Sequence, residues 1–109
     1  MNPNEFLAIE LMGWFDPDPK EGSVWVNESR SVCMRKCDWR PLENIQQAFE
    51  VVDRMVKNGW YYELGLAQGE GHECSFYIGG DDPLFRDEHI NPATAITLAA
   101  CKALKGEGG

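Results

Sequence analysis

The longest periodic run of hydrophobic residues lies mid-chain and predicts an amphipathic helix over residues 40–59. Apolar side chains recur there every three or four positions, with charged and amide side chains between them. The recurring apolar residues are Leu42, Ile45, Phe49, Val52 and Val56, reinforced by Ala48 and Met55. Asp38 or a neighbour leads in, Pro41 suits the first turn, and Asn58-Gly59 is typical of a helix stop. We expect this apolar stripe to lie in the core.

A period of two follows directly and predicts a β-hairpin. Alternate residues are apolar in "WYYELGLAQ" (60–68), and "HECSFYIGG" (72–80) repeats the pattern after the turn residues 69–71. If the two strands pair antiparallel, their apolar faces coincide. This arrangement predicts that Cys74 belongs to the core.

Capping residues predict two more helices, one near each end of the chain. Asn2 and Pro3 open the first, and Asn91 and Pro92 open the second. The inward positions of the second are mostly small: Ile96, Ala99, Ala100, Ala103 and Leu104. Small side chains let a helix approach its neighbours closely, so we expect tight packing there.

The remaining segments complete the predicted order of elements. The pattern predicts a short strand over residues 23–29 and a loop with some extended structure over residues 28–40. It predicts a second loop over residues 81–89, because they are mostly charged. Helix, strand, loop, helix, strand, strand, helix is the order of an α+β domain. We predict a small, mainly antiparallel sheet of about three strands packed with three helices in a layered α/β/α-type sandwich. Residues 1–105 form this single domain and 106–109 a flexible tail.

The same segments resemble the phage ABA sandwich domain, a family of small bacteriophage and prophage proteins. The resemblance covers nearly the whole chain and rests on "CDWRPLENIQQAFEVVDRM", "GWYYELGL", "HECSFYIGG" and "NPATAITLAACKAL". These are packing patterns. The resemblance implies a layered arrangement of helices and sheet and a phage origin, with no defined activity or binding residue to transfer. The cysteine-containing approach to the central helix and the acidic loop depart from the family pattern.

Charge narrows the range of partners. Ten Lys and Arg stand against eighteen Asp and Glu, giving a formal net charge of −8 and a pI of about 4.6. An acidic chain repels phosphate backbones, which disfavours direct nucleic-acid binding and favours a basic protein partner. The sequence has no export signal and no run near the roughly 18 apolar residues of a membrane span, so we expect a cytoplasmic protein of the bacterial host cell.

The cysteines and histidines raise the question of metal or redox chemistry. They are Cys33, Cys37, Cys74, Cys101, His72 and His89. Structural zinc sites usually show two tight ligand pairs, whereas this chain has one C-x3-C pair, and a redox pair is normally C-x-x-C. No phosphate-binding loop or serine nucleophile elbow occurs. We expect no disulfide, cofactor or enzymatic activity, and metal binding by the cysteines stays an open alternative.

Two charged segments are the candidate contact surfaces for a partner. Their residues are Arg35, Lys36, Trp39, Arg40, Asp81, Asp82, Asp87 and Glu88. The basic group has the composition of a nucleic-acid contact as well, but the net charge argues against that use. We expect an accessory protein that binds a host or phage protein, for example as an inhibitor of host defence or of a nucleic-acid-binding protein. The alternative is a structural or housekeeping protein that self-associates as a homo-oligomer. Exposed tryptophans are expected to anchor either interface.

Overall fold

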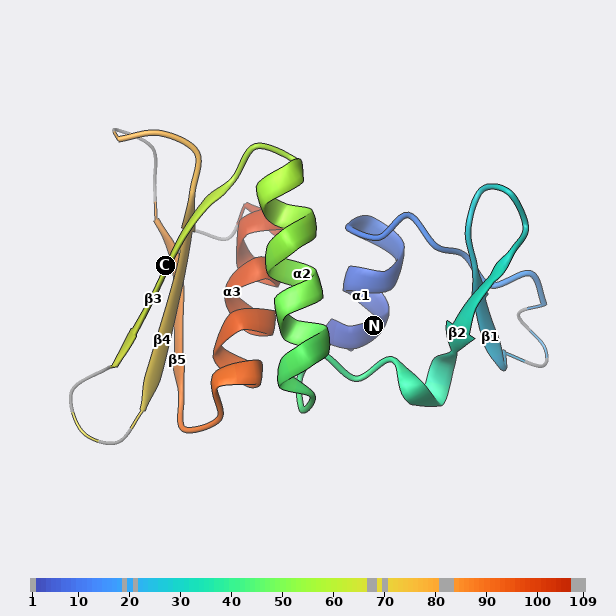
Figure 1. The fold of residues 1–109 in the computed structure, drawn as a ribbon, viewed down its shortest axis with the longest axis horizontal. Coiled ribbons are helices and arrows are strands. Elements are labelled where there is room, and N and C mark those ends of the chain that lie inside the picture. Colours follow the sequence, from blue (N-terminus) through green and yellow to red (C-terminus); the bar gives the residue numbers. More distant parts are fainter. Residues whose placement is uncertain are drawn as a thin grey trace.

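The computed structural model describes residues 2–18, 20, 22–66, 69, 71–80 and 84–106. Its layers follow one another along the longest axis as a three-stranded sheet, the helices α2 and α3, the helix α1 and a two-stranded hairpin (Figure 1). The elements are α1 (Pro3–Glu10), β1 (Val24–Val26), β2 (Val32–Arg35), the 3-10 helix η1 (Lys36–Asp38), α2 (Ile45–Lys57), β3 (Tyr61–Leu66), β4 (His72–Tyr77), β5 (Phe85–His89) and α3 (Pro92–Lys105). The α+β class, the three helices and the small antiparallel sheet are confirmed.

The larger sheet has the strand order β3-β4-β5, with both pairs antiparallel. The predicted hairpin is confirmed, since Tyr62 lies opposite Phe76 and Leu64 opposite Cys74. Phe76 and Cys74 are fully buried against the helical layer. The central strand β4 is therefore the centre of the core, as the alternation in the sequence indicated.

The charged loop predicted over residues 81–89 is wrong for its second half, which forms β5. Phe85 pairs with Phe76 of β4 and is buried. Asp87 points to the same face, where Lys102 of α3 contacts its carboxylate at 3.0 Å. An inward aspartate with a partner on the covering helix allows a mostly charged segment to form an edge strand.

Helix α2 begins later than predicted, at Ile45. The side chain of Asn44 accepts a hydrogen bond from the backbone N–H of Gln47, which caps the helix, and residues 41–43 form a turn before it. Pro41 and Asp38 therefore precede the helix. The buried side of α2 consists of Ala48, Val51, Val52 and Met55.

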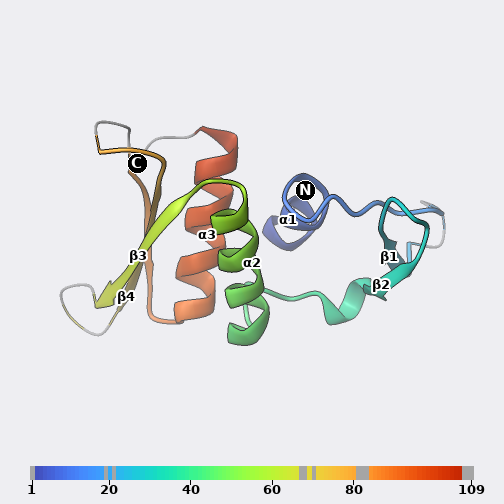
Figure 2. The ribbon, with the colours of Figure 1, turned by 45° about the horizontal axis from the view of Figure 1, so that its top comes forward.

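The predicted caps of the outer helices are confirmed. Asn2 accepts from the backbone N–H of Glu5 at 2.9 Å, and Asn91 accepts from that of Ala93 at 2.9 Å. Helix α3 contacts α1, α2, β4 and β5. Its buried residues are Ala93, Ala95, Ile96, Thr97, Ala99, Ala100, Cys101 and Ala103. The small side chains let one helix pack against four elements at once (Figure 2).

The small hairpin lies at the far end of the molecule from the sheet (Figure 1). Strand β1 pairs antiparallel with β2, and Trp25 lies opposite Met34. The prediction of a loop with some extended structure over residues 28–40 therefore agrees with β2 but is wrong for η1. Each of these elements is only one turn or a few residues long, too short for a periodic pattern to develop in the sequence.

Candidate protein-binding surface

The exposed arginines of the predicted basic surface pair with acidic residues of the same segment. The Arg35 guanidinium contacts the Asp38 carboxylate at 3.0 Å, and that of Arg40 contacts Glu43 at 3.7 Å. Both pairs are well exposed to solvent and contribute little to stability. The partner-binding role of these residues stays a prediction.

Lys36 is more tightly held than the two arginines. Its ammonium donates to the Asp16 carboxylate at 2.6 Å and lies 4.5 Å from the centre of the Trp25 ring. The hydrogen bond from Lys36 lowers the pKa of Asp16 below its usual value of 3.8. This contact ties the start of η1 to the chain that precedes the hairpin.

Trp39 is a core residue with only 2% of its surface exposed. Its indole N–H donates to the backbone carbonyl of Asn4 in α1 at 2.8 Å, and its ring packs edge-to-face on Trp14 with 4.9 Å between centroids. Trp25 is buried as well, at 3%. The expectation of exposed tryptophans is therefore wrong for these two, since both rings pack inside the protein.

The acidic candidates on β5 also have cationic neighbours. The Asp87 carboxylate contacts Lys102 at 3.0 Å, and that of Glu88 contacts Arg86 at 3.2 Å. The other two candidates of this group lie outside the described residues: Asp81 and Asp82. Strand β5 and the segment 35–40 lie at opposite ends of the molecule (Figure 1). The two predicted groups therefore do not form one site.

The cysteines divide into two buried and two more accessible thiols. Burial raises the pKa of Cys74 to about 12 and that of Cys101 to about 11, which keeps both protonated. Cys33 is half-buried and Cys37 is exposed. Within the described residues, no group of three or more His, Cys, Asp or Glu side chains comes close enough to hold a metal ion. The buried thiols pack as small apolar side chains.

A surface that the sequence reading missed lies where α2 borders the edge strand β3. We call it the α2/β3 face and define it by six large, partly exposed apolar side chains. They are Ile45, Phe49 and Val56 of α2, exposed by 40, 43 and 47%, and Tyr62, Leu64 and Leu66 of β3, exposed by 41, 44 and 79%. Three of these belong to the stripe that periodicity assigned to the core.

Two hollows lie along the α2/β3 face. One, of about 300 Å³, is lined by Ile45, Phe49 and Leu64 together with residues of β4 and the start of α3. The other, of about 310 Å³, lies between Val56 and Tyr62 at the opposite end of α2. Each end of the border between α2 and β3 therefore has a hollow that is lined by apolar side chains.

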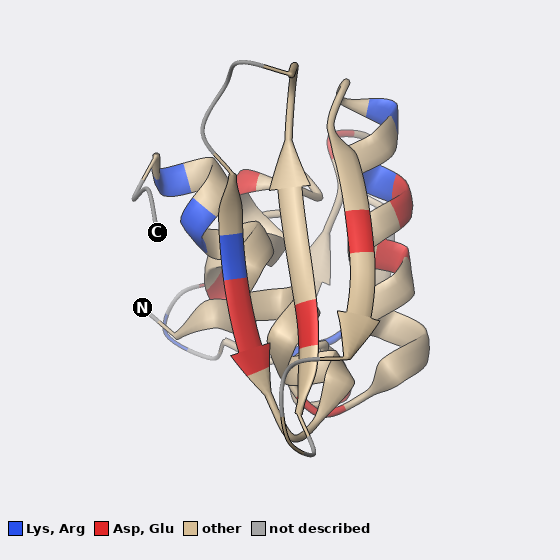
Figure 3. Cartoon of the chain, turned by 90° about the vertical axis from the view of Figure 1, so that its left-hand side faces the viewer, with Lys and Arg blue, Asp and Glu red and all other residues tan. Residues whose placement is uncertain are grey.

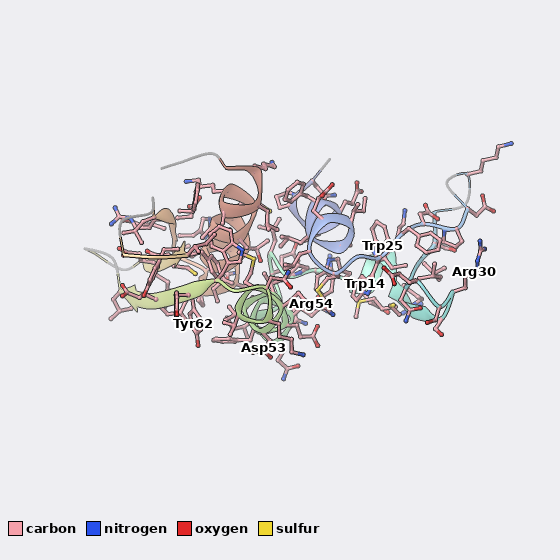
Figure 4. The ribbon with its side chains drawn as sticks, turned by 90° about the horizontal axis from the view of Figure 1, so that it is seen from above. Trp14, Trp25, Arg30, Asp53, Arg54 and Tyr62 are labelled. Carbon is pink, nitrogen blue, oxygen red and sulfur yellow. The ribbon has the colours of Figure 1, made fainter. Side chains whose placement is uncertain are left out.

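The backbone of β3 adds a polar element to this apolar surface. In the described sheet β3 pairs with β4 alone, so one row of its N–H and C=O groups faces outward. Figure 3 shows α2 standing beside that open edge, and Figure 4 places Tyr62 on the sheet side of α2, with Arg54 on the side towards Trp14. A strand edge and an apolar helix surface therefore face the same space.

None of the helices in the described part of the chain combines the length and hydropathy of a membrane-spanning segment. No curated protein matches the chain. A crystal structure of a phage protein from Bacillus cereus ATCC 14579 is similar, with a TM-score of 0.69 and 14% sequence identity over 96% of this chain and 89% of that one. The sequence model of the phage ABA sandwich domain matches residues 5–103, nearly the whole chain. This chain therefore belongs to the phage ABA sandwich domain family.

Proposed function

We propose that this phage protein acts by binding another protein and performs no chemistry of its own. The α2/β3 face carries the proposal, because its six apolar side chains expose on the order of 600 Å² together. A patch of that size is at the upper end of what monomeric proteins present to water and often marks an interaction site. The open edge of β3 beside it supplies hydrogen-bonding groups that an apolar patch lacks.

The net charge supports a basic partner in the cytoplasm of the bacterial host. Arg35, Lys36 and Arg40 already contact acidic groups of this chain, so the surplus of eight negative charges is left to attract cations. Such a field accelerates association with a positively charged host or phage protein. Inhibition of a host defence protein or of a nucleic-acid-binding protein is the role that suits this charge.

Self-association in a structural or housekeeping role is the second candidate. It is favoured by the apolar character of the α2/β3 face, because interfaces between identical subunits are more apolar than those of transient complexes. In this case the acidic surface serves solubility, and the protein needs no host target.

Both candidates are tested by capture from a lysate of the bacterial host at low and high salt. Immobilised protein is compared with Leu64→Lys, on the α2/β3 face, and Leu84→Lys, a matched leucine elsewhere that is exposed by 52%. We expect one stoichiometric partner that Leu64→Lys loses, Leu84→Lys keeps and high salt weakens. Size-exclusion chromatography with light scattering tests the second candidate function, self-association, which predicts an oligomer of this chain. Capture that Leu64→Lys leaves unchanged contradicts a role of this face.

A further inference from the structure

The helical layer is wider than the sheet that it covers. Helix α3 packs on β4 and β5, whereas α2 packs on α3 and stands beside the free edge of β3 (Figure 3). Two packed helices about 10 Å apart span about 20 Å, the width of four strands about 4.8 Å apart. The described sheet supplies three strands. Among the described residues no strand pairs with the outer edge of β3, so the position of a fourth strand, next to β3 and beside α2, has no strand in it.

A second copy of this chain does not fit that position through its own sheet. Pairing β3 with β3 of another molecule places the two strands about 4.8 Å apart. Each α2 extends beyond its own β3, so the two α2 helices would meet in the same space, although packed helices need 8–10 Å between their axes. The position therefore suits an extended segment that has no helix on the side turned to this protein.

We propose that the α2/β3 face receives an extended segment of a partner protein, which adds to β3 as the fourth strand of the sheet. This inference rests on the proposed protein-binding function and names the form of its ligand. The outward N–H and C=O groups of β3 pair with the backbone of the incoming segment, as in other cases of strand addition. Its inward side chains cover Ile45, Phe49 and Val56, which β3 leaves exposed.

The two hollows and one carboxylate specify the side chains of that segment. Leu64 and Tyr62, two residues apart on one face of β3, each line one hollow, so apolar side chains at positions i and i+2 of the segment face the two hollows. The hollow at Leu64 continues past β3 to His72 and Glu73 of β4. Glu63 lies between them on the opposite face, where opposite charges on neighbouring strands attract. Position i+1 of the partner is therefore lysine or arginine, in agreement with the negative net charge.

The test uses synthetic peptides and nuclear magnetic resonance of the full chain. The probe is Lys-Val-Lys-Leu-Lys-Val-Lys, and the control Lys-Lys-Val-Leu-Val-Lys-Lys has the same composition and charge without the alternation. We expect the probe to bind at least about tenfold more tightly, because the control cannot bury its apolar side chains while pairing with β3. Alternate amides within Tyr61–Leu66 should become protected from hydrogen exchange when the probe is bound.

Variants separate the apolar and the charged contributions. Leu64→Lys should weaken the probe at least about tenfold, and Leu84→Lys should leave its affinity unchanged. Glu63→Lys should weaken it about 2- to 5-fold and increase binding of Glu-Val-Glu-Leu-Glu-Val-Glu. Glu63 is exposed and accepts one long hydrogen bond, from the Tyr77 hydroxyl at 3.5 Å, so we expect this variant to keep the fold.

Four results overturn the inference. The first two are no binding at about 1 mM probe, and binding of the control peptide as tight as that of the probe. The other two are binding of the probe without new protection of β3 amides from hydrogen exchange, and protection of these amides that rises with protein concentration when no peptide is present. The last result means that a second copy occupies the edge. If any of these occurs while a lysate partner is still lost in Leu64→Lys, strand addition is wrong and the protein-binding function stands. If Leu64→Lys leaves the lysate partner bound, the proposed function itself fails at this face.

Discussion

Thr97 lies within α3 with its side chain fully buried, and its hydroxyl oxygen has no hydrogen-bond partner in the described part of the chain. Thr94, one turn earlier in the same helix, donates its hydroxyl to the carbonyl of Leu42 at 2.7 Å. Replacement of each threonine by valine exchanges a hydroxyl for a methyl group of similar size. The same chemical change should therefore have opposite effects at the two positions.

The magnitudes follow from the environment of each hydroxyl. A buried hydroxyl without a partner costs about 1–3 kcal/mol, so Thr97→Val should raise the free energy of unfolding by about 1–2 kcal/mol. Thr94→Val loses a hydrogen bond and leaves the Leu42 carbonyl short of a donor, which should lower the free energy of unfolding by about 1 kcal/mol. For a chain of this length, 1 kcal/mol corresponds to roughly 4 °C in Tm.

Urea unfolding followed by far-ultraviolet circular dichroism measures both effects, and thermal melts provide a second estimate. With a slope of about 1–3 kcal/mol per molar urea, a change of about 1 kcal/mol should move the two midpoints in opposite directions by about 0.3–1 M each. A Thr97→Val protein that is equal to or less stable than the parent refutes the reasoning. It would mean that the hydroxyl has a partner, such as a buried water molecule.

Three further predictions concern contacts elsewhere in the chain. Trp39→Phe should lower the free energy of unfolding by about 2 kcal/mol in urea titrations, because it removes the indole hydrogen bond to α1 and part of a buried ring; an unchanged midpoint contradicts this. Stability should fall as pH rises above about 9, because the thiols of Cys74 and Cys101 ionise near 9.0 when unfolded but near 12 and 11 when folded. Replacing both cysteines by alanine should remove this part of the pH dependence. The pKa of Asp16 is lowered in the folded protein, so its carboxylate stabilises the fold at pH values above the unfolded pKa of 3.8. This contribution is lost as the pH falls below 3.8 and the carboxylate becomes protonated. Asp16→Asn, which breaks the ionic contact with Lys36, should therefore reduce the dependence of stability on pH in this acidic range.

The sequence predicts α2 and its amphipathic character but not which part of its apolar surface is buried. Of the stripe that periodicity assigned to the core, Ala48, Val52 and Met55 are buried, whereas Ile45, Phe49 and Val56 are partly exposed. Val51, which was not assigned to the stripe, is fully buried. Both sets recur at helical spacing, and only the position of α3 decides between them. The apolar surface of α2 is wide, and this width was the one sign in the sequence that more than one element packs against the helix.

Strand β5 could not be predicted from the sequence because Phe85 is the one apolar residue on its inward face, followed there by Asp87 and His89. Asp87 faces the helical layer and is satisfied by Lys102, fifteen residues later in α3. In the sequence alone Asp87 is a charge without a partner, and a mostly charged segment is assigned to a loop. The missing information is a contact between two elements, which residue type alone does not carry.

The candidate site was missed for a related reason. The notable local features of the sequence were charges and tryptophans, and the structure shows arginines paired with neighbouring acids and Trp39 in the core. The α2/β3 face consists of ordinary apolar residues whose exposure depends on the number of strands in the sheet. That number is a property of the whole fold.

The central place of α3 has a consequence for how the protein is made. Because α3 contacts α1, α2, β4 and β5, a nascent chain that has reached residue 91 contains all the other helices and strands but lacks the helix that joins them. Until residues 92–105 leave the ribosome, the apolar sides of those elements stay open to chaperones and proteases. We therefore expect the chain to complete its fold only once α3 has been translated, and a product truncated before Pro92 to be degraded.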